Sequence, residues 1–282
     1  MTKGILAGAI AIAAALGGTI AGAQAFDDTI YPNFKGQWRP VGGPMRFDTN
    51  KAWGQGQQAP LVPEYQTIFE ANLADQAAGG QGTTPTFTCI SPGMPRVTNG
   101  YGQMEVVITP QSTHILVEHI HDNRRIFTDG RDFPKEIEPT LIGYSIGRWL
   151  DTTGSGHYDV LAVETRGFKG PRAFDSSGIP LSSDNQTIVK ERIYLDKADP
   201  NILHNEITTI DHALTHPWTI TKNYRRTVTK EPIWWREAVC AEDNPHVRIG
   251  NDVYMVSADG YLMPVRKGQA APNLKYFQAP GR

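Results

Sequence analysis

The amino-acid sequence predicts a mainly β fold, built as an antiparallel meander with one helix near its N-terminal end. From Gln103 onward, successive segments rich in Val, Ile, Thr and Tyr alternate between apolar and polar residues, which is the pattern of half-buried strands. Most stretches between them are too short for the crossover helices that parallel strands need. Because an open meander leaves two exposed edges, we expect a lipocalin-like barrel, with a β-sandwich as the alternative.

Four regions follow one another along the chain. Residues 1–25 are a predicted signal peptide, and 26–100 form an extended N-terminal segment that carries the helix and packs outside the barrel. Residues 101–240 form the barrel body, and 241–282 form a C-terminal hairpin and tail. The predicted strands are 103–110, 113–120, 124–128, 158–168, 187–195, 202–210 and 218–228, with the hairpin at 253–265.

The first 25 residues have the features of a secretory signal peptide. Lys3 precedes a long run of small apolar residues, and Ala23-Gln24-Ala25 is a small-x-small cleavage site. An uncleaved membrane anchor is the alternative, because the run is nearly long enough to span a bilayer. We therefore expect an exported protein, periplasmic or extracellular, with no stable membrane insertion after cleavage.

The helix is predicted at about 64–78. Glu64 lies in its first turn, and Gly79-Gly80 ends it. Its apolar residues recur at the spacing of one helix face; they are Tyr65, Ile68, Phe69 and Leu73. We expect this face to pack on the main body.

The two cysteines, Cys89 and Cys240, predict one disulfide. The chain contains no others, and an exported protein meets an oxidising compartment. Such a long closed loop is worth about 4 kcal/mol in the chain-entropy model. Two free buried thiols are the alternative.

Charge and motifs exclude several kinds of partner and cofactor. The formal net charge is −2, and removal of Lys3 with the signal peptide makes it −3. The sequence contains no block of like charge, so we expect no binding to nucleic acid. No phosphate-binding glycine loop follows a strand and opens a helix, so we expect no adenylate cofactor.

The stretch RRIFTDGRDFP, residues 124–134, has two interpretations. Asp129-Gly130 is the pair that a two-residue hairpin turn prefers, because both central positions need positive φ. The alternative is a charged catalytic or binding loop, in which Arg131 would contact a ligand.

Two glutamates share strand faces with apolar residues. Glu191 alternates with Val189 and Ile193, and Glu164 lies in a row with Ala162. A buried carboxylate is costly unless it is paired. One interpretation is a structural network in which Glu191 or Glu164 meets one of three arginines; these are Arg131, Arg192 and Arg225.

The other interpretation is a mixed polar and aromatic cavity that holds a ligand. A desolvated Glu191 would then have a raised pKa and could move protons. The predicted ligand-binding residues are Arg131, Glu164, Arg225, Trp218, Tyr224 and Trp149.

Histidines form two further candidate sites. His119 and His121 share a strand face and could hold a metal, but the sequence indicates no third ligand, so we predict no metal site. Asp211 and His212 could act as orienter and base, or could simply belong to a turn before Pro217.

Several motifs occur together in this order: CISPGMPR (89–96), RRIFTDGRDFP (124–134), YSIGRW (144–149), VLAVETRGF (160–168), VKERI (189–193) and DHALTHPWT (211–219). In these motifs and in the helix segment, the chain resembles a large group of exported bacterial proteins for which no activity is established. The resemblance covers most of the mature chain and implies export, but no reaction. The longer turn LDTTGSGHYD (150–159) departs from the group and puts the local hairpin geometry in question.

Three functions are compatible with these observations. The first is an exported barrel that binds a small, largely apolar or aromatic organic molecule in its cavity. The second is a secreted hydrolase, isomerase or lyase that uses Glu191 or the Asp211–His212 pair as acid and base. The third is an envelope structural or interaction protein, which a filled barrel interior would favour. The sequence does not give the oligomeric state.

Overall fold

The computed structural model describes residues 26–43, 45–100, 102–118, 123–231, 234–236, 239–240, 245–250 and 252–272. The predicted signal peptide and the two candidate metal-binding histidines, His119 and His121, lie outside these residues. No helix in the described ranges is long and apolar enough to cross a membrane.

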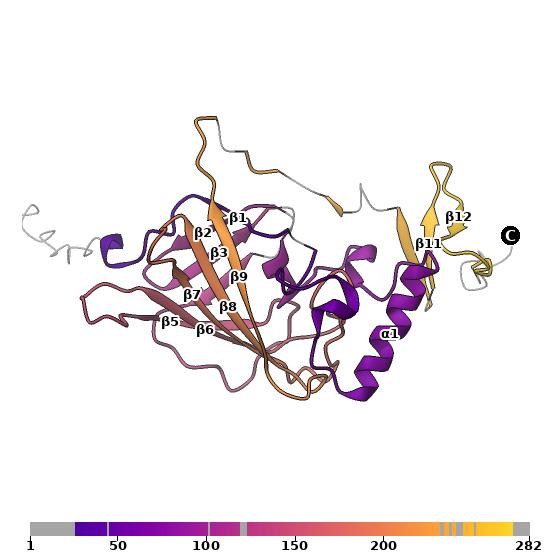
Figure 1. Ribbon diagram of the computed structural model, residues 1–282, viewed down its shortest axis with the longest axis horizontal. Helices are drawn as coiled ribbons and strands as arrows, with labels where there is room; N and C mark the ends of the chain where they lie inside the picture. Colours follow the sequence, from indigo (N-terminus) through magenta and orange to yellow (C-terminus); the bar gives the residue numbers. More distant parts are fainter. Residues whose placement is uncertain are drawn as a thin grey trace, which may run out of the picture.

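Nine strands form a closed barrel (Figure 1). They are β1 (Gln37–Pro40), β2 (Met104–Ile108), β3 (Ser112–Val117), β4 (Arg124–Phe127), β5 (Tyr144–Leu150), β6 (Val160–Arg166), β7 (Ile188–Leu195), β8 (Ile202–Ile210) and β9 (Trp218–Arg226). β1 closes the barrel by pairing with both β2 and β9. The mainly β fold and the barrel are confirmed, and the sandwich alternative is wrong. The barrel has one strand more than the eight of a lipocalin.

The purely antiparallel arrangement is wrong at one place. β4 and β5 pair in parallel, with Ile126 opposite Ser145. The chain reaches β5 through the long connection 128–143, so Asp129-Gly130 does not form a two-residue turn between antiparallel strands as the hairpin interpretation expects. Pro134 and Pro139 in this connection have no N–H for a ladder hydrogen bond, and the chain continues past the turn before it pairs again.

Residues alternate between the barrel interior and its outer surface. In β8, for example, Leu203, Asn205, Ile207 and Thr209 are buried, whereas the residues between them are half-exposed. The period of two that predicts the strands therefore also divides the inner face from the outer face. The longer turn at 151–159 leaves the pairing of β5 with β6 regular up to Leu150 opposite Val160.

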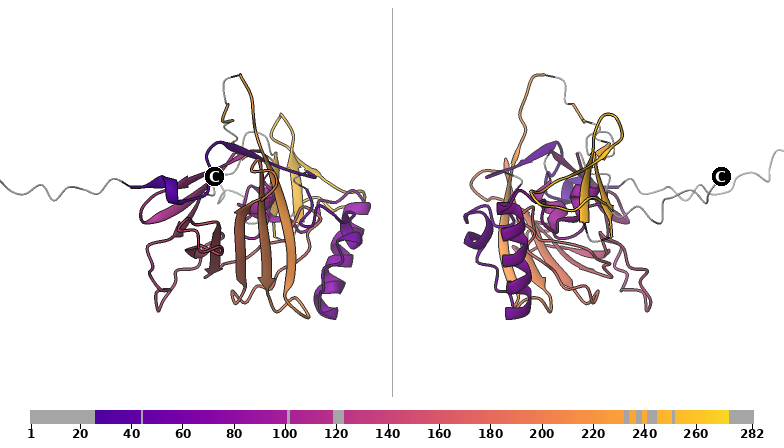
Figure 2. Two further views of the ribbon diagram at one scale, coloured as in Figure 1. Left: turned by 60° about the vertical axis from the view of Figure 1, so that its left-hand side comes forward. Right: turned by 90° about the vertical axis from the view of Figure 1, so that its right-hand side faces the viewer.

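The predicted helix is present as α1 (Pro63–Ala77) and stands beside the barrel wall (Figure 2). Its predicted apolar face is only partly buried, since Ile68 is exposed and Phe69 is buried. Asn72 also anchors it: its Nδ2 donates to the carbonyl of Ser177 at 2.5 Å, and its Oδ1 accepts from the Thr83 N–H at 2.6 Å.

A separate three-stranded sheet forms the C-terminal part. Its strands are β10 (His246–Ile249), β11 (Asp252–Val256) and β12 (Leu262–Pro264). It lies next to α1 (Figure 1), where Arg266 bridges Asp75 of the helix at 2.7 Å and Asp252 of β11 at 2.9 Å.

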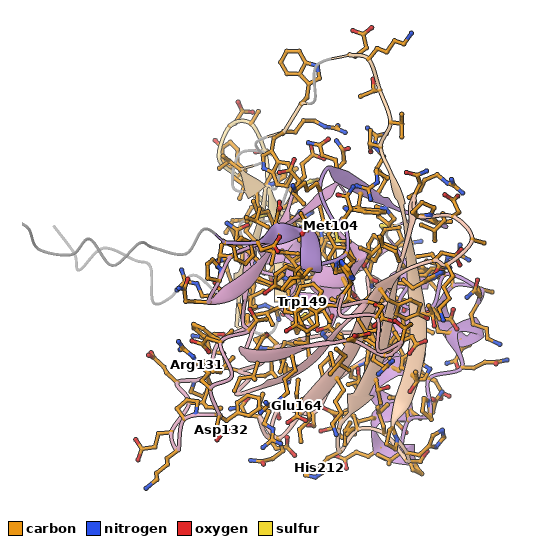
Figure 3. The ribbon with its side chains drawn as sticks, turned by 90° about the vertical axis from the view of Figure 1, so that its left-hand side faces the viewer. Met104, Arg131, Asp132, Trp149, Glu164 and His212 are labelled. Atoms are coloured by element: carbon orange, nitrogen blue, oxygen red, sulfur yellow. A yellow bond between two sulfur atoms is a disulfide. The ribbon has the colours of Figure 1, made fainter. Side chains whose placement is uncertain are left out.

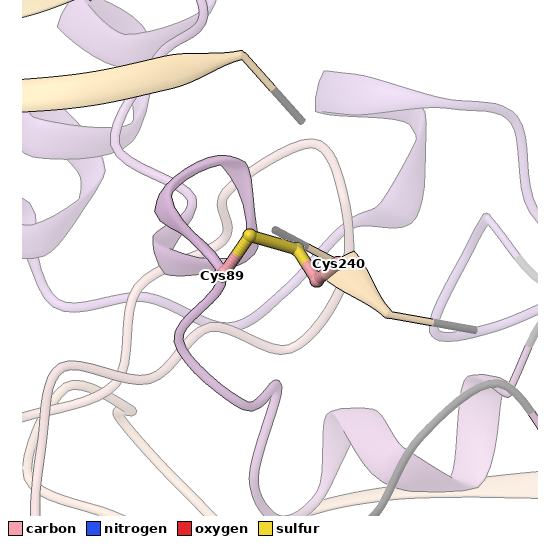
Figure 4. The surroundings of a disulfide bond; sticks show 2 residues. All are labelled: Cys89 and Cys240. Carbon is pink, nitrogen blue, oxygen red and sulfur yellow. A yellow bond between two sulfur atoms is a disulfide. The ribbon is translucent and has the colours of Figure 1, made fainter. Parts of the chain in front are cut away.

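The predicted disulfide is confirmed. Cys89 and Cys240 are bonded, with their Cα atoms 5.5 Å apart (Figure 4). The bond joins the segment before β2 to the segment before β10. It therefore connects the chain on both sides of the barrel body.

Candidate functional site

The barrel interior contains a small cavity among its side chains. It measures about 30 Å³, and its walls include Val106, Ile115, Leu203 and Tyr224. A space of that size holds one or two waters, whereas small-molecule sites measure roughly 300–1,000 Å³. This cavity therefore has no room for an organic ligand.

Glu191 lies inside the barrel in an ion pair with Arg124 of β4. The guanidinium donates to both carboxylate oxygens, at 2.9 and 2.5 Å, and the Asn205 amide donates to one of them at 2.8 Å. The predicted partners were other arginines. Arg192 lies on the outer face of the same strand, because neighbouring strand residues point to opposite faces. Both oxygens of Glu191 are thus held in a structural network.

The predicted aromatic ligand contacts pack among other aromatic residues. Trp218 packs against Phe47 and Phe174, with ring centroids 4.8 and 5.0 Å apart. Trp149 packs similarly on Tyr31, at 5.1 Å.

Tyr224 is also an interior residue. Its hydroxyl donates to the carbonyl of Thr98 at 2.7 Å. Burial raises the pKa of this phenol well above its ordinary value. Tyr224 therefore stays neutral and closes off part of the interior.

The remaining predicted residues lie apart from one another. Asp211 is buried, and its carboxylate accepts from Thr187 and Ser182 at 2.5 and 2.9 Å. His212 is 73% exposed and contacts Asp184. Because they bond to different partners, Asp211 and His212 do not form the predicted base and orienter pair. Arg225 lies on the outer face of β9, 3.4 Å from Asp199.

A larger hollow lies on the outside of the barrel. It measures about 540 Å³ and covers the outer face of β5, β6, β7 and β8 beside the connection that follows β4. We call it the outer hollow. The side chains that face it are Arg131, Asp132, Phe133, Ile146, Arg148, Leu150, Ala162, Glu164, Arg166, Lys190, Arg192, Glu206 and Thr208. Figure 3 shows Arg131, Asp132 and Glu164 gathered on this side of the barrel.

The strand register arranges the floor of the outer hollow in rows. In one row, Arg148 of β5 lies opposite Ala162 of β6, which lies opposite Arg192 of β7, which lies opposite Glu206 of β8. In the adjacent row the order is Ile146, Glu164, Lys190 and Thr208. The smallest side chain therefore lies between two arginines.

The carboxylates of the outer hollow have short partners. Glu164 accepts from Arg166 at 2.5 Å, and Glu206 accepts from the Tyr194 hydroxyl at 2.7 Å. Burial, together with this hydrogen bond, raises the pKa of Tyr194 to about 12. Tyr194 thus remains a hydrogen-bond donor at neutral pH and holds Glu206.

Among the residues that the structure describes, three cations of the outer hollow have no such short partner. The nearest carboxylate oxygens lie 3.7 Å from each of Arg148, Lys190 and Arg192, beyond hydrogen-bond range. Their side chains are 62, 55 and 50% exposed. Arg131, in contrast, donates to Asp129 at 2.6 Å. The outer hollow therefore contains three cations with unused donors.

Two residues of this site, Arg131 and Glu164, were predicted from the sequence as ligand contacts; Arg192 was named only as a possible partner of the glutamates, and Arg148 and Lys190 were not named. Arg148 lies on β5, a strand that the sequence analysis did not predict. Lys190 and Arg192 share the outer face of a predicted strand, and this alternation with Glu191 was the available signal.

Lys222 is a further residue that the sequence pattern did not single out. It lies on the inner face of β9, where its ammonium donates to the carbonyl of Arg46 at 2.6 Å. Burial lowers its pKa to about 7, and the charges of Asp175 and Asp48 only partly offset this. This amine is an interior charge, remote from the outer hollow.

Neither metal ligands nor relatives identify the site. Among the described residues, no group of three or more His, Cys, Asp or Glu side chains could hold a metal ion. No protein-family model matches the chain, and no curated protein matches it in sequence.

Proposed function

We propose that this protein is an exported binding protein that takes up a small organic molecule in the outer hollow of its barrel wall. The observation that carries the proposal is the hollow itself, about 540 Å³ in size, within the range of small-molecule sites. Its walls combine four apolar side chains with eight charged ones, a more polar lining than is usual for small-molecule sites, so the ligand should itself carry charged or polar groups. Export is part of the proposal and depends on residues 1–25.

The proposed ligand site is the outer hollow and not the barrel cavity, where the sequence pattern placed it. A cavity of about 30 Å³ does not accommodate an aromatic molecule, and the interior residues are engaged with one another. The acid and base candidates give little support to catalysis, since Glu191 is ion-paired with Arg124 and Asp211 is bonded apart from His212.

A structural or interaction role is the second candidate. The small size of the interior cavity favours it, because the barrel then acts as a rigid scaffold. It differs from the first candidate in one prediction: the protein would carry no discrete small molecule.

Native mass spectrometry of the protein purified from its natural source tests the proposal. We expect an added small-molecule mass that is lost on denaturation. Ala162→Trp should abolish it, because Ala162 lies on the floor of the outer hollow and a large ring there fills the space. Val107→Trp is the control, since Val107 is exposed on β2, outside the hollow. A bare chain mass from the wild type, or equal ligand loss in both variants, would contradict the proposal.

A further inference from the structure

We infer that the ligand of the outer hollow is an organic anion whose oxyanion head group lies between Arg148 and Arg192, above Ala162. This inference rests on the proposed function and names the chemical class of the molecule bound. Carboxylate and phosphoryl head groups share the required chemistry. Arginine is suited to both, because its planar guanidinium presents parallel N–H donors to two oxygens.

Arg148 and Arg192 lie on either side of Ala162 in the barrel wall. Arg148 and Arg192 are both directly opposite Ala162 in the register of β5, β6 and β7. Neighbouring strands lie about 4.8 Å apart, so the Cα atoms of the two arginines are separated by about 10 Å. The methyl group between them leaves the space above it open. Two guanidinium groups can therefore approach one oxyanion from opposite sides.

The outer hollow carries more positive than negative charge. Five cationic side chains and three carboxylates face the outer hollow, because Glu191, which also belongs to its wall, turns its side chain inward. Two of the carboxylates, Glu164 and Glu206, already accept short hydrogen bonds. The third, Asp132, has a 96% exposed side chain. Arg131 is already paired with Asp129 at 2.6 Å, so an excess of one positive charge remains, which favours an anionic ligand.

Three cations of the outer hollow have side-chain N–H groups that are available to a ligand. In the described part of the chain, no side-chain hydrogen bond forms at Arg148, Lys190 or Arg192, and each has only a 3.7 Å ion pair. Such long, exposed pairs contribute little energy. An anion that accepts hydrogen bonds from these groups thus displaces little, and it gains charge-assisted hydrogen bonds.

The apolar residues give the ligand its orientation. Ile146 and Leu150 flank Arg148 along the outer face of β5, and Phe133 adds an aromatic ring from the connection. Arg166 lies over that ring, 4.8 Å from its centroid. The hydrocarbon or aromatic body of the ligand should therefore lie on the β5 side, with its head group toward β7.

Three probes with the same ring test the inference: 2-naphthoate, 2-naphthyl phosphate and the uncharged 2-naphthylmethanol. Each is titrated into the full mature protein by isothermal calorimetry at low and moderate salt. We expect at least one of the two anions to bind at least 10-fold more tightly than the alcohol, with binding weakened by salt. The relative affinities of the two anions decide between carboxylate and phosphoryl head groups.

Variants locate the head group. Arg148→Gln and Arg192→Gln should each lower anion affinity about 10-fold, the equivalent of one charge-assisted hydrogen bond. Arg225→Gln is the matched control, because Arg225 is an equally exposed outer-face arginine on β9. The affinity of this variant for the anions should equal that of the wild type. Equal effects of all three substitutions would overturn the inference.

The remaining outcomes separate this inference from the proposed function. If the alcohol binds as tightly as the anions and Ala162→Trp abolishes both, the oxyanion is wrong but the outer hollow remains the site. If none of the probes binds at millimolar concentration, the inference is wrong, and native mass spectrometry decides the proposed function independently.

Discussion

Arg124 on β4 and Glu191 on β7 form a bidentate ion pair across the inside of the barrel, between strands that are not neighbours. Both side chains are almost completely buried. Breaking such a pair leaves an uncompensated buried charge, which is more costly than removing both charges.

Glu191→Gln should therefore destabilise the protein by about 3–5 kcal/mol. The double variant Arg124→Met with Glu191→Leu should lose less, because no buried charge remains. Urea unfolding of Arg124→Met, Glu191→Leu and the double variant measures the interaction as a double-mutant cycle. Additive effects would show that the two groups do not interact. A Glu191→Gln variant that stays folded should bind the naphthyl anions as the wild type does.

Because of Lys222, the free energy of unfolding should change with pH above pH 7. The folded protein releases its ammonium proton near pH 7, whereas the unfolded chain releases it near the ordinary pKa of 10.5. The unfolded state binds more protons between these values, so the free energy of unfolding rises with pH in this window. From pH 7 to pH 9 the gain is on the order of 2 kcal/mol.

The control for this prediction is Lys222→Met, whose unbranched side chain is one atom shorter and carries no charge. Its stability should lack this rise, and at pH 7 it should exceed that of the wild type. Thermal or urea unfolding at several pH values makes the comparison. Parallel pH profiles for the two proteins would show that Lys222 is not the titrating group.

Gly147 tests how tightly the interior is packed. A Cβ atom at this position would lie 2.7 Å from Ile126 Cγ2 and 3.1 Å from Leu161 Cδ1. Gly147→Ala should therefore overpack the interior and destabilise the protein by about 1–3 kcal/mol. Ala162→Val adds a larger volume, but on the outer face of the neighbouring strand, and should change stability by less than about 0.5 kcal/mol. Equal effects would mean that the interior can accommodate extra atoms.

The disulfide should hold the C-terminal sheet in place. In the double variant Cys89→Ala with Cys240→Ala, the link between the segment before β2 and the segment before β10 is lost. We expect faster amide hydrogen exchange in β10, β11 and β12, with the nine barrel strands still protected. The contrary result is equal loss of protection in the barrel and the C-terminal sheet.

The sequence predicted the parts of the fold that depend on local alternation. Strands β6 to β9 are long enough for their period of two to be clear, and they were predicted. β1 has only the four residues Gln37–Pro40, and it lies in a Gly- and Pro-rich segment that shows no sustained period. β5 contains Gly147, which has no side chain to pack and lowers strand propensity. The parallel pairing of β4 with β5 depends on contacts that are distant in sequence.

The candidate site was harder to predict for a related reason. Alternation indicated that Glu191 faces inward, but the identity of its partner depends on which strands lie across the barrel from one another. The outer hollow depends on register, because only the pairing of three strands places Arg148 and Arg192 on either side of Ala162. The sequence analysis also had no measure of how completely the interior is filled, and it therefore placed the ligand inside.

The most direct test of the account is the location of the bound probe. We would record amide chemical-shift changes in ¹⁵N-labelled protein titrated with the naphthyl anion that binds best. The account predicts changes around Phe133, Arg148, Ala162 and Arg192, on the outer face. Changes confined to interior positions such as Val106, Ile115 and Tyr224 would contradict it.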